Sequence, residues 1–489
     1  MKNKAIFTIP IIIILSLYMG TSSVFAKVPY PSFSFGPEGK PFPIQTPYMP
    51  ENVIGNTLYQ QDQGKLVNTL GLNNPNDIFI DKNDNLFISD SFNNRVVEIN
   101  GNGILLQEFG MGNNPKSRLN APDGVYVSQN GDVYVADTGN QRIAVYQSNG
   151  QFLKEYKKPD DVSLKNIMFA PIQLSIDERG FLFVVLRGSD EGVAVLSPDG
   201  KFQGFFGRNV TQLSLIERIK RNLYTKQQLA TNSNQVAASV SDVYIGNDNY
   251  VYTCTQNVST NQIKKLNTKG EDLFDNIDFN VNNDNFSANG DLSFSSITVD
   301  KNGFIYAVDK ENGLIFIYDN NGHILASFGM KLTGNNFRIG RFGMPVSIAV
   351  NSKGEIYVVD QSYNGIQVFK PTNFMKEVFT ATNLYNNGEY SKSKPYWEDI
   401  LKKNVFYYEA HLALGEIYYE NQQWSKSLSE LKLAKNQKMY SDALWQLRVV
   451  WVQKNLNKLV AALVLLFSLF FIAKKFNIKL KIKKLRIKP

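Results

Sequence analysis

GVYVSQNGDVYVADTGNQRIAVYQSNGQFLKEY, residues 124–156, is the stretch that decides the fold. It contains four short apolar runs separated by turns rich in Asn, Asp and Gly, which predicts four strands joined by tight hairpins. Similar stretches lie at residues 77–110 and 296–329, and six copies can be traced in all. One such small sheet cannot bury both of its faces, so the copies must pack on one another. Four-stranded repeats of this period predict the blades of a six-bladed β-propeller.

The second strand of each copy is the most regular part of the pattern. The six versions are NLFISD, DVYVAD, FLFVVL, YVYTCT, FIYAVD and EIYVVD. Four of them end in aspartate, at Asp90, Asp137, Asp309 and Asp360. Aspartates in turns accept hydrogen bonds from nearby backbone amides. Because these residues recur from copy to copy, we expect them to hold the turn of each hairpin and not to form a catalytic set.

The repeats resemble the NHL family. NHL repeats have a YVAD-like second strand followed by an asparagine–arginine pair, which this chain carries as Asn94-Arg95 and, in part, as Gln141-Arg142. The later copies lose the pair, as at Asn364-Gly365. The resemblance covers about residues 59–371 and implies a six-bladed propeller without naming a ligand.

The last copy lacks its fourth strand. Residues 59–71, YQQDQGKLVNTLG, are similar to the end of the second copy, VYQSNGQFLKEY. We therefore predict that residues 59–71 close the last blade, because closure pairs an otherwise open edge. The preceding residues 27–58 are rich in proline and are predicted to form an extended leader.

Both ends of the chain carry apolar segments. Residues 1–26 have a basic start, an apolar core and small residues at a cleavage-type spacing, which predicts a secretory signal peptide; the alternative is an uncleaved anchor. Residues 459–473 form an apolar run of about 22 Å as a helix. We interpret this run as a single transmembrane helix, Leu459–Ala473, the alternative being a buried or interfacial helix. The basic tail, residues 474–489, is then cytoplasmic by the positive-inside rule.

Charge and cysteine content limit the function classes. The net charge of +8 becomes −2 for residues 27–473 once the eight positive tail residues and Lys2 and Lys4 are removed. A near-neutral ectodomain argues against nucleic-acid binding, which needs clustered basic charge. The single cysteine, Cys254, excludes an intramolecular disulfide and is predicted to be a small buried residue.

An insertion at residues 208–239 interrupts the repeats. Leu215, Ile219 and Leu223 are spaced as on one face of an amphipathic helix. We predict a helical insertion in which Arg218, Lys220 and Arg221 bind an acidic partner or surface. The alternative is a helix that covers the propeller rim with a solvated basic face.

A helical period follows the propeller. Residues 374–441 contain two 34-residue units, in which Gly388 and Trp397 of the first match Gln422 and Leu431 of the second. The units resemble tetratricopeptide repeats (TPR), and the resemblance implies a helical surface for peptide or protein binding. Residues 442–458 are predicted to form a capping and linking helix that leads into the membrane.

Enzymatic functions of six-bladed propellers have weak support. Zinc-dependent relatives of NHL propellers use histidine ligands, but this chain has only His323 and His411. We predict no cofactor and no metal, and expect a membrane-anchored extracytoplasmic binding or scaffold protein. Its predicted partner is an envelope or membrane protein, such as a transporter component, or a cell-wall polysaccharide. The composition suggests a Gram-positive-type bacterium. The alternative function is that of a lactonase-like metal-dependent hydrolase.

Overall fold

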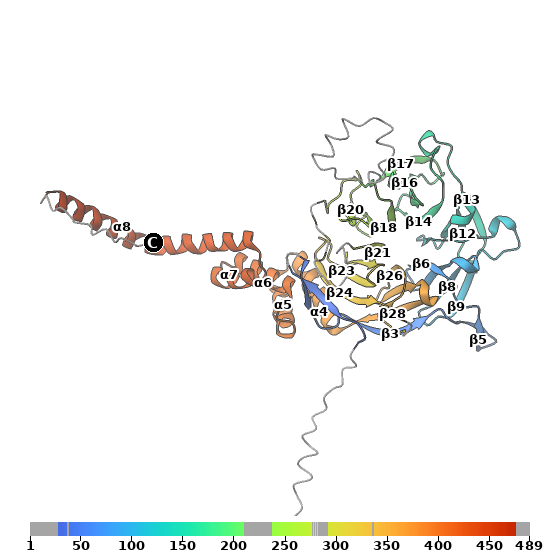
Figure 1. The fold of residues 1–489 in the computed structure, drawn as a ribbon, viewed down its shortest axis with the longest axis horizontal. Helices are drawn as coiled ribbons and strands as arrows, with labels where there is room; N and C mark the ends of the chain where they lie inside the picture. The colour runs from blue at the N-terminus through green and yellow to red at the C-terminus, as the bar shows by residue number, and fades with distance from the viewer. Residues whose placement is uncertain are drawn as a thin grey trace, which may run out of the picture. The chain divides into compact units, whose positions relative to one another are not determined.

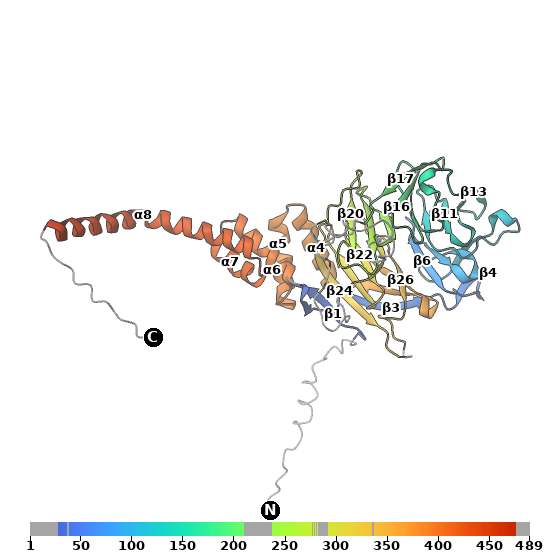
Figure 2. The ribbon, with the colours of Figure 1, turned by 45° about the horizontal axis from the view of Figure 1, so that its top comes forward.

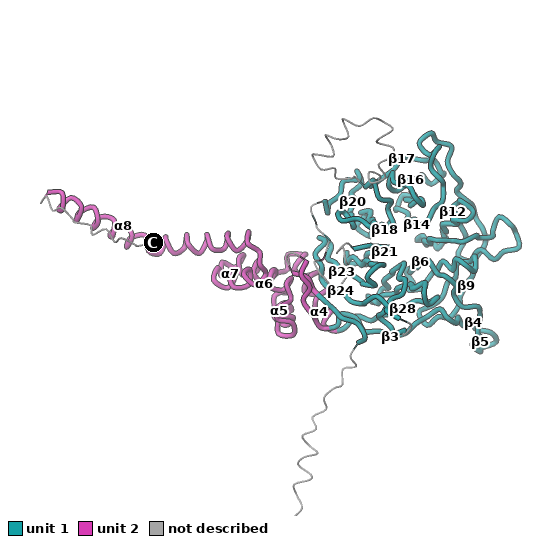
Figure 3. The backbone as a smooth tube through the Cα atoms, viewed as in Figure 1, with its two compact units in different colours: residues 1–33, 46–280, 284–372 teal, residues 34–45, 281–283, 373–489 magenta. Residues whose placement is uncertain are grey.

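A computed structural model describes residues 28–36, 39–209, 237–275, 277, 279, 281, 292–334 and 337–475. The predicted signal peptide and all of the tail beyond Lys475 lie outside these residues. The chain divides into two compact units, one with residues 46–280 and 284–372 as its main part and one dominated by residues 373–489 (Figure 3).

The first unit is a mainly β propeller. Within the described residues, six sheets of three or more strands are present, and their first strands contact one another in a closed ring (Figure 1). The ring follows the order β6 (Pro75–Ile80), β10 (Val125–Val127), β14 (Pro171–Ile176), β18 (Val240–Ile245), β21 (Phe294–Val299) and β26 (Pro345–Val350). The predicted propeller is confirmed.

Outward from the ring, the strands of each sheet run antiparallel. The second strands are β7 (Leu86–Asp90), β11 (Val133–Asp137), β15 (Leu182–Leu186), β19 (Val251–Thr255), β22 (Ile305–Asp309) and β27 (Ile356–Asp360). The third strands are β8 (Arg95–Ile99), β12 (Arg142–Tyr146), β16 (Val193–Leu196), β20 (Ile263–Leu266), β23 (Leu314–Tyr318) and β28 (Gly365–Pro371). The fourth strands that follow in sequence are β9 (Leu105–Phe109), β13 (Phe152–Tyr156), β17 (Phe202–Phe206) and β24 (Ile324–Lys331).

Neighbouring sheets pack face to face and so bury the apolar sides that a single copy would expose. Ile78 and Ile88 of one sheet share a core cluster with Val359 and Val368 of the neighbouring one. The same arrangement recurs between the next sheets, where Val96 packs in one cluster with Val135. Burial of aliphatic side chains between repeats, not within one repeat, is therefore the main stabilising contribution.

The strand that closes the last sheet is not the one that the sequence predicts. β3 (Tyr48–Ile54) pairs with β28, and Ile366 lies opposite Ile54. Tyr48 is fully buried, stacks on Phe328 at 5.3 Å between ring centroids and donates from its hydroxyl to the Gly354 carbonyl at 3.1 Å. The prediction that residues 59–71 close the blade is wrong.

Residues 59–71 instead contribute to a hairpin of their own. β4 (Leu58–Asp62) pairs with β5 (Lys65–Thr69) across a two-residue turn. Gln63 and Gly64 both adopt positive φ, 45° and 79°, which suits the tight turns that join adjacent strands. A segment that folds back on itself at once pairs locally and does not reach the last blade.

The proline-rich leader is also more structured than its composition indicates. Ser32 and Phe33 of β1 (Ser32–Phe35) pair with β24, and β2 (Pro41–Pro43) follows. β25 (Arg341–Phe342) pairs with β24 in parallel. In β3, Pro50 lies where the register of the pairing shifts, a position that tolerates the missing backbone donor.

The second unit is helical. Its helices are α4 (Asn373–Asn386), α5 (Tyr390–Lys403), α6 (Tyr408–Glu420), α7 (Trp424–Leu433) and α8 (Gln437–Lys475), each in contact with the next. The turns after α4 and α6 contain Gly388 and Gln422 at φ of 75° and 57°. The left-handed conformation of both residues confirms that they hold equivalent positions, although only glycine adopts it without strain.

α8 is one continuous helix of 39 residues (Figure 2). The predicted linking segment 442–458 and the apolar run 459–473 are parts of this single helix. It is long and apolar enough to cross a membrane, and none of its most apolar stretch is buried inside the chain.

Candidate functional site

The first strands of all six sheets surround a central cavity of about 50 Å³. The residue type that lines the cavity differs from sheet to sheet. The third residue of the first strand is polar in five sheets: Asp77, Gln173, Asp242, Ser296 and Ser347. Two of these are carboxylates, and neither was singled out from the sequence. Asp77 and Asp242 break the symmetry of the repeats and make this cavity a candidate site for acid–base chemistry.

Asp77 links three sheets. Its Oδ2 accepts a hydrogen bond from the Val125 amide at 2.9 Å, and its Oδ1 accepts from the Ser347 hydroxyl at 2.7 Å. Ser347 in turn accepts from the Ile78 amide at 3.3 Å. Asp77 therefore joins the first strands of its own sheet and both neighbours.

Asp242 plays the corresponding part further around the ring. Its Oδ2 accepts from the Ile297 amide of the next sheet at 2.9 Å, and its Oδ1 accepts from the Val243 amide at 2.7 Å. Serine hydroxyl groups make similar links elsewhere. Ser175 Oγ accepts a hydrogen bond from the Ile245 amide, and Ser296 Oγ accepts one from the Ile348 amide. A ring of side-chain to backbone hydrogen bonds thus joins successive sheets around the cavity.

The two carboxylates also influence each other. Burial, together with the negative charge of Asp77, raises the pKa of Asp242 to about 7. Burial likewise raises the pKa of Asp77, against the opposing effect of its hydrogen bonds. A carboxyl group with a pKa of about 7, such as that of Asp242, can hold a proton near neutral pH, which is a property of general acids and bases. The same perturbation also arises in purely structural buried carboxylates.

The size of the cavity decides what can reach these carboxylates. About 50 Å³ admits a few water molecules, whereas pockets that bind organic ligands occupy about 300–1,000 Å³. An organic substrate does not fit beside Asp77 and Asp242 in this conformation. In this conformation the space beside the pair is sufficient only for water-sized molecules.

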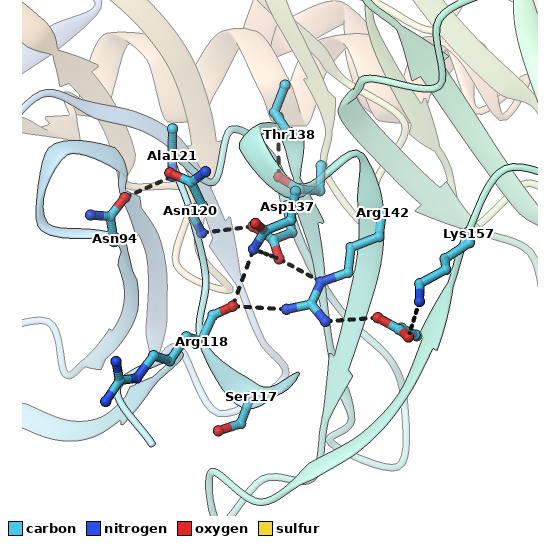
Figure 4. Close-up of polar contacts among 12 residues, drawn as sticks. Asn94, Ser117, Arg118, Asn120, Ala121, Asp137, Thr138, Arg142 and Lys157 are labelled. Atoms are coloured by element: carbon cyan, nitrogen blue, oxygen red, sulfur yellow. Dashed lines mark hydrogen bonds and ion pairs between the residues drawn. The ribbon is translucent and has the colours of Figure 1, made fainter. Parts of the chain in front are cut away.

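A second polar cluster surrounds Asp137 in the second sheet (Figure 4). Arg142 Nε donates to Asp137 Oδ2 at 2.7 Å, and another guanidinium nitrogen donates to the Arg118 carbonyl at 2.8 Å. Asp137 Oδ1 accepts from the Asn120 amide at 2.8 Å. Both charged side chains are buried, so this ion pair connects the second strand to the segment that enters the sheet.

The other repeated aspartates have similar partners. Asp90 pairs with Arg95 at 2.7 Å and accepts from the Asn73 amide at 2.7 Å. Asp309 accepts from Ser293, and Asp360 accepts from Gly343 and Met344. The prediction that these residues bond backbone amides is confirmed. It also explains the arginine of the NHL-like pair, which neutralises a buried carboxylate.

The predicted binding residues Arg218, Lys220 and Arg221 lie outside the described residues, as do residues 210–236 as a whole. The two ends of the insertion are described. Asn209 Nδ2 donates to the Ala238 carbonyl at 2.7 Å and to Thr255 Oγ1 at 3.0 Å. Arg208 pairs with Glu191 at 3.0 Å. The insertion thus begins and ends at one point on the propeller.

The two histidines and the cysteine have structural surroundings. His411 is buried, with Nδ1 2.7 Å from Glu430 and Nε2 2.7 Å from the Val405 carbonyl, and His323 lies 3.1 Å from Asp319. Cys254 is fully buried, and burial raises the pKa of its thiol. The predicted buried role of Cys254 is confirmed. In the part of the chain that the structure describes, no three His, Cys, Asp or Glu side chains gather as metal ligands.

A wider cavity lies at the edge of the propeller. It occupies about 380 Å³ between Gln60 of the β4–β5 hairpin and residues of the first two sheets, including Leu106, Met111 and Tyr146. Leu106 and Met111 are 47% and 58% exposed. The size suits a small ligand or a partner side chain, unlike that of the central cavity.

Comparisons with known proteins agree with the propeller. The model for the NHL repeat matches residues 119–146, and no curated protein matches the chain. Solved structures similar to the chain include a streptogramin B lyase, at 14% identity and a TM-score of 0.42, covering 70% of this chain and 98% of the lyase. A virginiamycin B lyase from Staphylococcus aureus has 16% identity and a TM-score of 0.41, covering 65% and 89%. A gluconolactonase from Xanthomonas campestris has 12% identity and a TM-score of 0.40, covering 67% and 98%.

Proposed function

We propose that this chain is a membrane-anchored extracytoplasmic binding or scaffold protein. In this proposal a six-bladed NHL-type propeller and a TPR-like helical region act as recognition surfaces, and α8 anchors them. The partner is an envelope or membrane protein, such as a transporter component, or a cell-wall polysaccharide.

The observation that carries the proposal is the exposure of α8. Leu463, Leu466 and Phe470 are 54%, 60% and 64% exposed. A continuous apolar helix of this length is unfavourable in water, and a bilayer is the environment that stabilises it. Orientation follows from the signal-peptide pattern and the basic tail, with the propeller outside and the C-terminus in the cytoplasm.

The interior of the propeller supports binding over catalysis. Its central cavity is too small for an organic substrate, and the repeated aspartates are engaged by backbone amides and arginines. Recognition then falls to the outer surfaces, where the insertion at residues 208–239 interrupts the repeat. The insertion contains three basic residues, Arg218, Lys220 and Arg221, whose charge suits an acidic partner.

The helical region supports a second binding surface. α5 and α7 begin 34 residues apart, at Tyr390 and Trp424, the period of TPR units. Gly415 of α6 packs tightly on Leu431 of α7, and its carbonyl accepts from Ser427 at 2.7 Å. Close helix pairs of this kind stack into surfaces that bind extended peptides or proteins.

A crosslinking and co-purification experiment tests which of the two surfaces, the insertion or the helical region, binds the partner. The full chain, tagged after Pro489, is crosslinked in native envelopes and purified, and co-purifying proteins and glycans are quantified. The matched variants replace Arg218, Lys220 and Arg221 with Gln, or replace the exposed α7 residues Lys426 and Lys432 with Gln. Loss of one defined partner with the first variant alone supports the insertion as the site. Equal capture by both variants and by a chain that lacks residues 380–440 but keeps the tag contradicts a binding role for either surface.

A second candidate function is a lactonase-like metal-dependent hydrolase, favoured by the two carboxylates, Asp77 and Asp242, that line the central cavity. Under this alternative the central cavity opens to admit substrate. Hydrolysis of a lactone series by the purified chain, abolished in both Asp77→Asn and Asp242→Asn variants that keep the wild-type melting temperature, supports it. The metal content of the purified chains is measured as well. This function requires stoichiometric metal in the wild type and its loss in the variants.

A further inference from the structure

Apolar residues recur along α8 with spacings that alternate between four and three. The series forms what we call the α8 seam: Trp445, Val449, Val452, Leu456, Leu459, Leu463, Leu466 and Phe470. It has no polar interruption over 26 residues, or about 38 Å of helix. An average spacing of 3.5 is the pattern by which two helices pack along each other.

Most of the α8 seam is exposed in the isolated chain, and Val449 is half-buried. Trp445, Val452 and Leu456 are 64%, 43% and 52% exposed, and the exposure continues to Phe470 at 64%. Only the start of α8 is covered by its own chain, where Ala443 is fully buried and α7 is the neighbouring helix.

The half of the seam that precedes the apolar run is the informative half. From residue 459 onward nearly every residue is apolar, so a lipid environment accounts for the composition. Between Gln446 and Lys458 the polar and charged side chains all lie off the seam: Gln446, Arg448, Gln453, Lys454, Asn455, Asn457 and Lys458. Three apolar residues of this stretch also lie off it: Leu447, Val450 and Trp451.

We propose that the α8 seam pairs with the α8 seam of a second copy of this chain, in parallel. The proposal rests on the membrane anchoring proposed above, because single-span chains inserted in the same direction have parallel α8 helices at equal depth. The two helices then pack in register, and each seam residue contacts the same residue of the other copy. Paired copies would also present two of each recognition surface, which strengthens binding to a repeated partner.

The size of the seam suits a stable pair. Sixteen seam side chains, at roughly 60–120 Å² of apolar surface each, bury about 1,000 Å² or more, which reaches the area of specific interfaces. The charge pattern is compatible with pairing as well. Lys454 and Lys458 lie on the outer side of the helix, and Arg448 faces Gln453 of the other copy at the positions that flank the seam. Like charges are therefore not brought together.

A cysteine scan in membranes tests the proposal on the full chain. Cys254 is fully buried, so the unsubstituted chain provides the baseline for oxidative crosslinking. Single cysteines replace Val449 through Lys458 one at a time, and isolated membranes are treated with a mild oxidant. We expect disulfide-linked dimer to peak at Val449, Val452 and Leu456, at least fivefold above Lys454→Cys and Lys458→Cys.

A second variant checks that the peaks arise from the seam. In a Leu459→Cys reporter chain, Val452→Lys with Leu456→Lys should reduce dimer at least fivefold, whereas Val450→Lys with Asn457→Lys, both on the outer side of the helix, should leave it unchanged. A flat scan, or peaks at Val450 and Trp451, would overturn the proposal. Carbonate extraction of the same membranes distinguishes the two failures: a flat scan in fully extracted protein rejects the anchor, and a flat scan in retained protein rejects the pairing alone.

Discussion

Asp77 and Asp242 line the same central cavity, and each accepts a hydrogen bond from the first strand of the following sheet. The two carboxylates raise each other's cost of ionisation while they join the ring of sheets. A structural link and a site of protonation therefore coincide at the axis of this propeller.

The stability of the chain should depend on pH through Asp242. The unfolded carboxyl has a pKa of about 3.9, and the folded one is raised to about 7. The folded state therefore retains a proton that the unfolded state has lost, so stability falls as pH rises from about 4 to 7. Between pH 8 and pH 5 we expect the wild type to gain on the order of 2 kcal/mol relative to Asp242→Asn, measured by urea unfolding.

The control for this pH dependence is Asp199→Asn. Asp199 is exposed, and its hydrogen bond to Lys201 lowers the pKa of the carboxyl to about 2. It stays ionised in both states over this pH range, so the difference from the wild type should remain constant. A constant difference for Asp242→Asn as well would contradict the assignment.

The buried ion pair of Arg142 and Asp137 should be costly to break. Arg142→Gln leaves Asp137 as a buried charge without its partner, at a cost of about 3–5 kcal/mol. Arg179→Gln removes an ion pair with Asp177 in which the arginine is 70% exposed, and should cost less than about 1 kcal/mol. Melting temperatures of the two variants provide the comparison. Equal losses would mean that the buried pair adds nothing beyond an exposed one.

The closing role of β3 can be tested with two tyrosines. Tyr48→Ala removes a fully buried ring from β3 and should destabilise the propeller by about 3–5 kcal/mol. Tyr59→Ala acts on the β4–β5 hairpin, where the side chain is 40% exposed, and should have a small effect. Chemical denaturation measures both. A larger loss for Tyr59→Ala would restore the hairpin as the closing element.

Arginine in the apolar run should release the chain from membranes. Val464→Arg with Leu465→Arg places two charges near the centre of the proposed span, at about 2.5–3.5 kcal/mol each. Val450→Arg with Trp451→Arg lies before the run and serves as the matched control. Carbonate extraction should release the first variant and retain the second, while protease added to cells without a wall should degrade the propeller and spare a tag after Pro489. Protection of the propeller would reverse the orientation.

Local patterns in the sequence were enough to predict the repeating parts of the molecule. Alternation of apolar residues and Asn/Gly turns specify each blade, because a hairpin depends on residues only a few positions apart. The aspartates Asp137 and Asp360 were interpreted correctly for the same reason, since their partners lie in the adjoining turn and incoming segment. The helix pair around Gly388 also follows from spacing alone.

Tertiary structure decided what depends on distant segments. β3 was selected over residues 65–71 because Tyr48 fits between Phe328 and Gly354, whereas Gln63 and Gly64 turn the rival strand back on its own neighbour. Asp77 and Asp242 lie 165 positions apart in the sequence, and only closure of the ring brings them to one cavity. The sequence by itself thus determined the blades and the helix pairs, through short-range hydrogen bonding and apolar periodicity. Closure and the meeting of the central carboxylates depend on long-range packing, which no local pattern encodes.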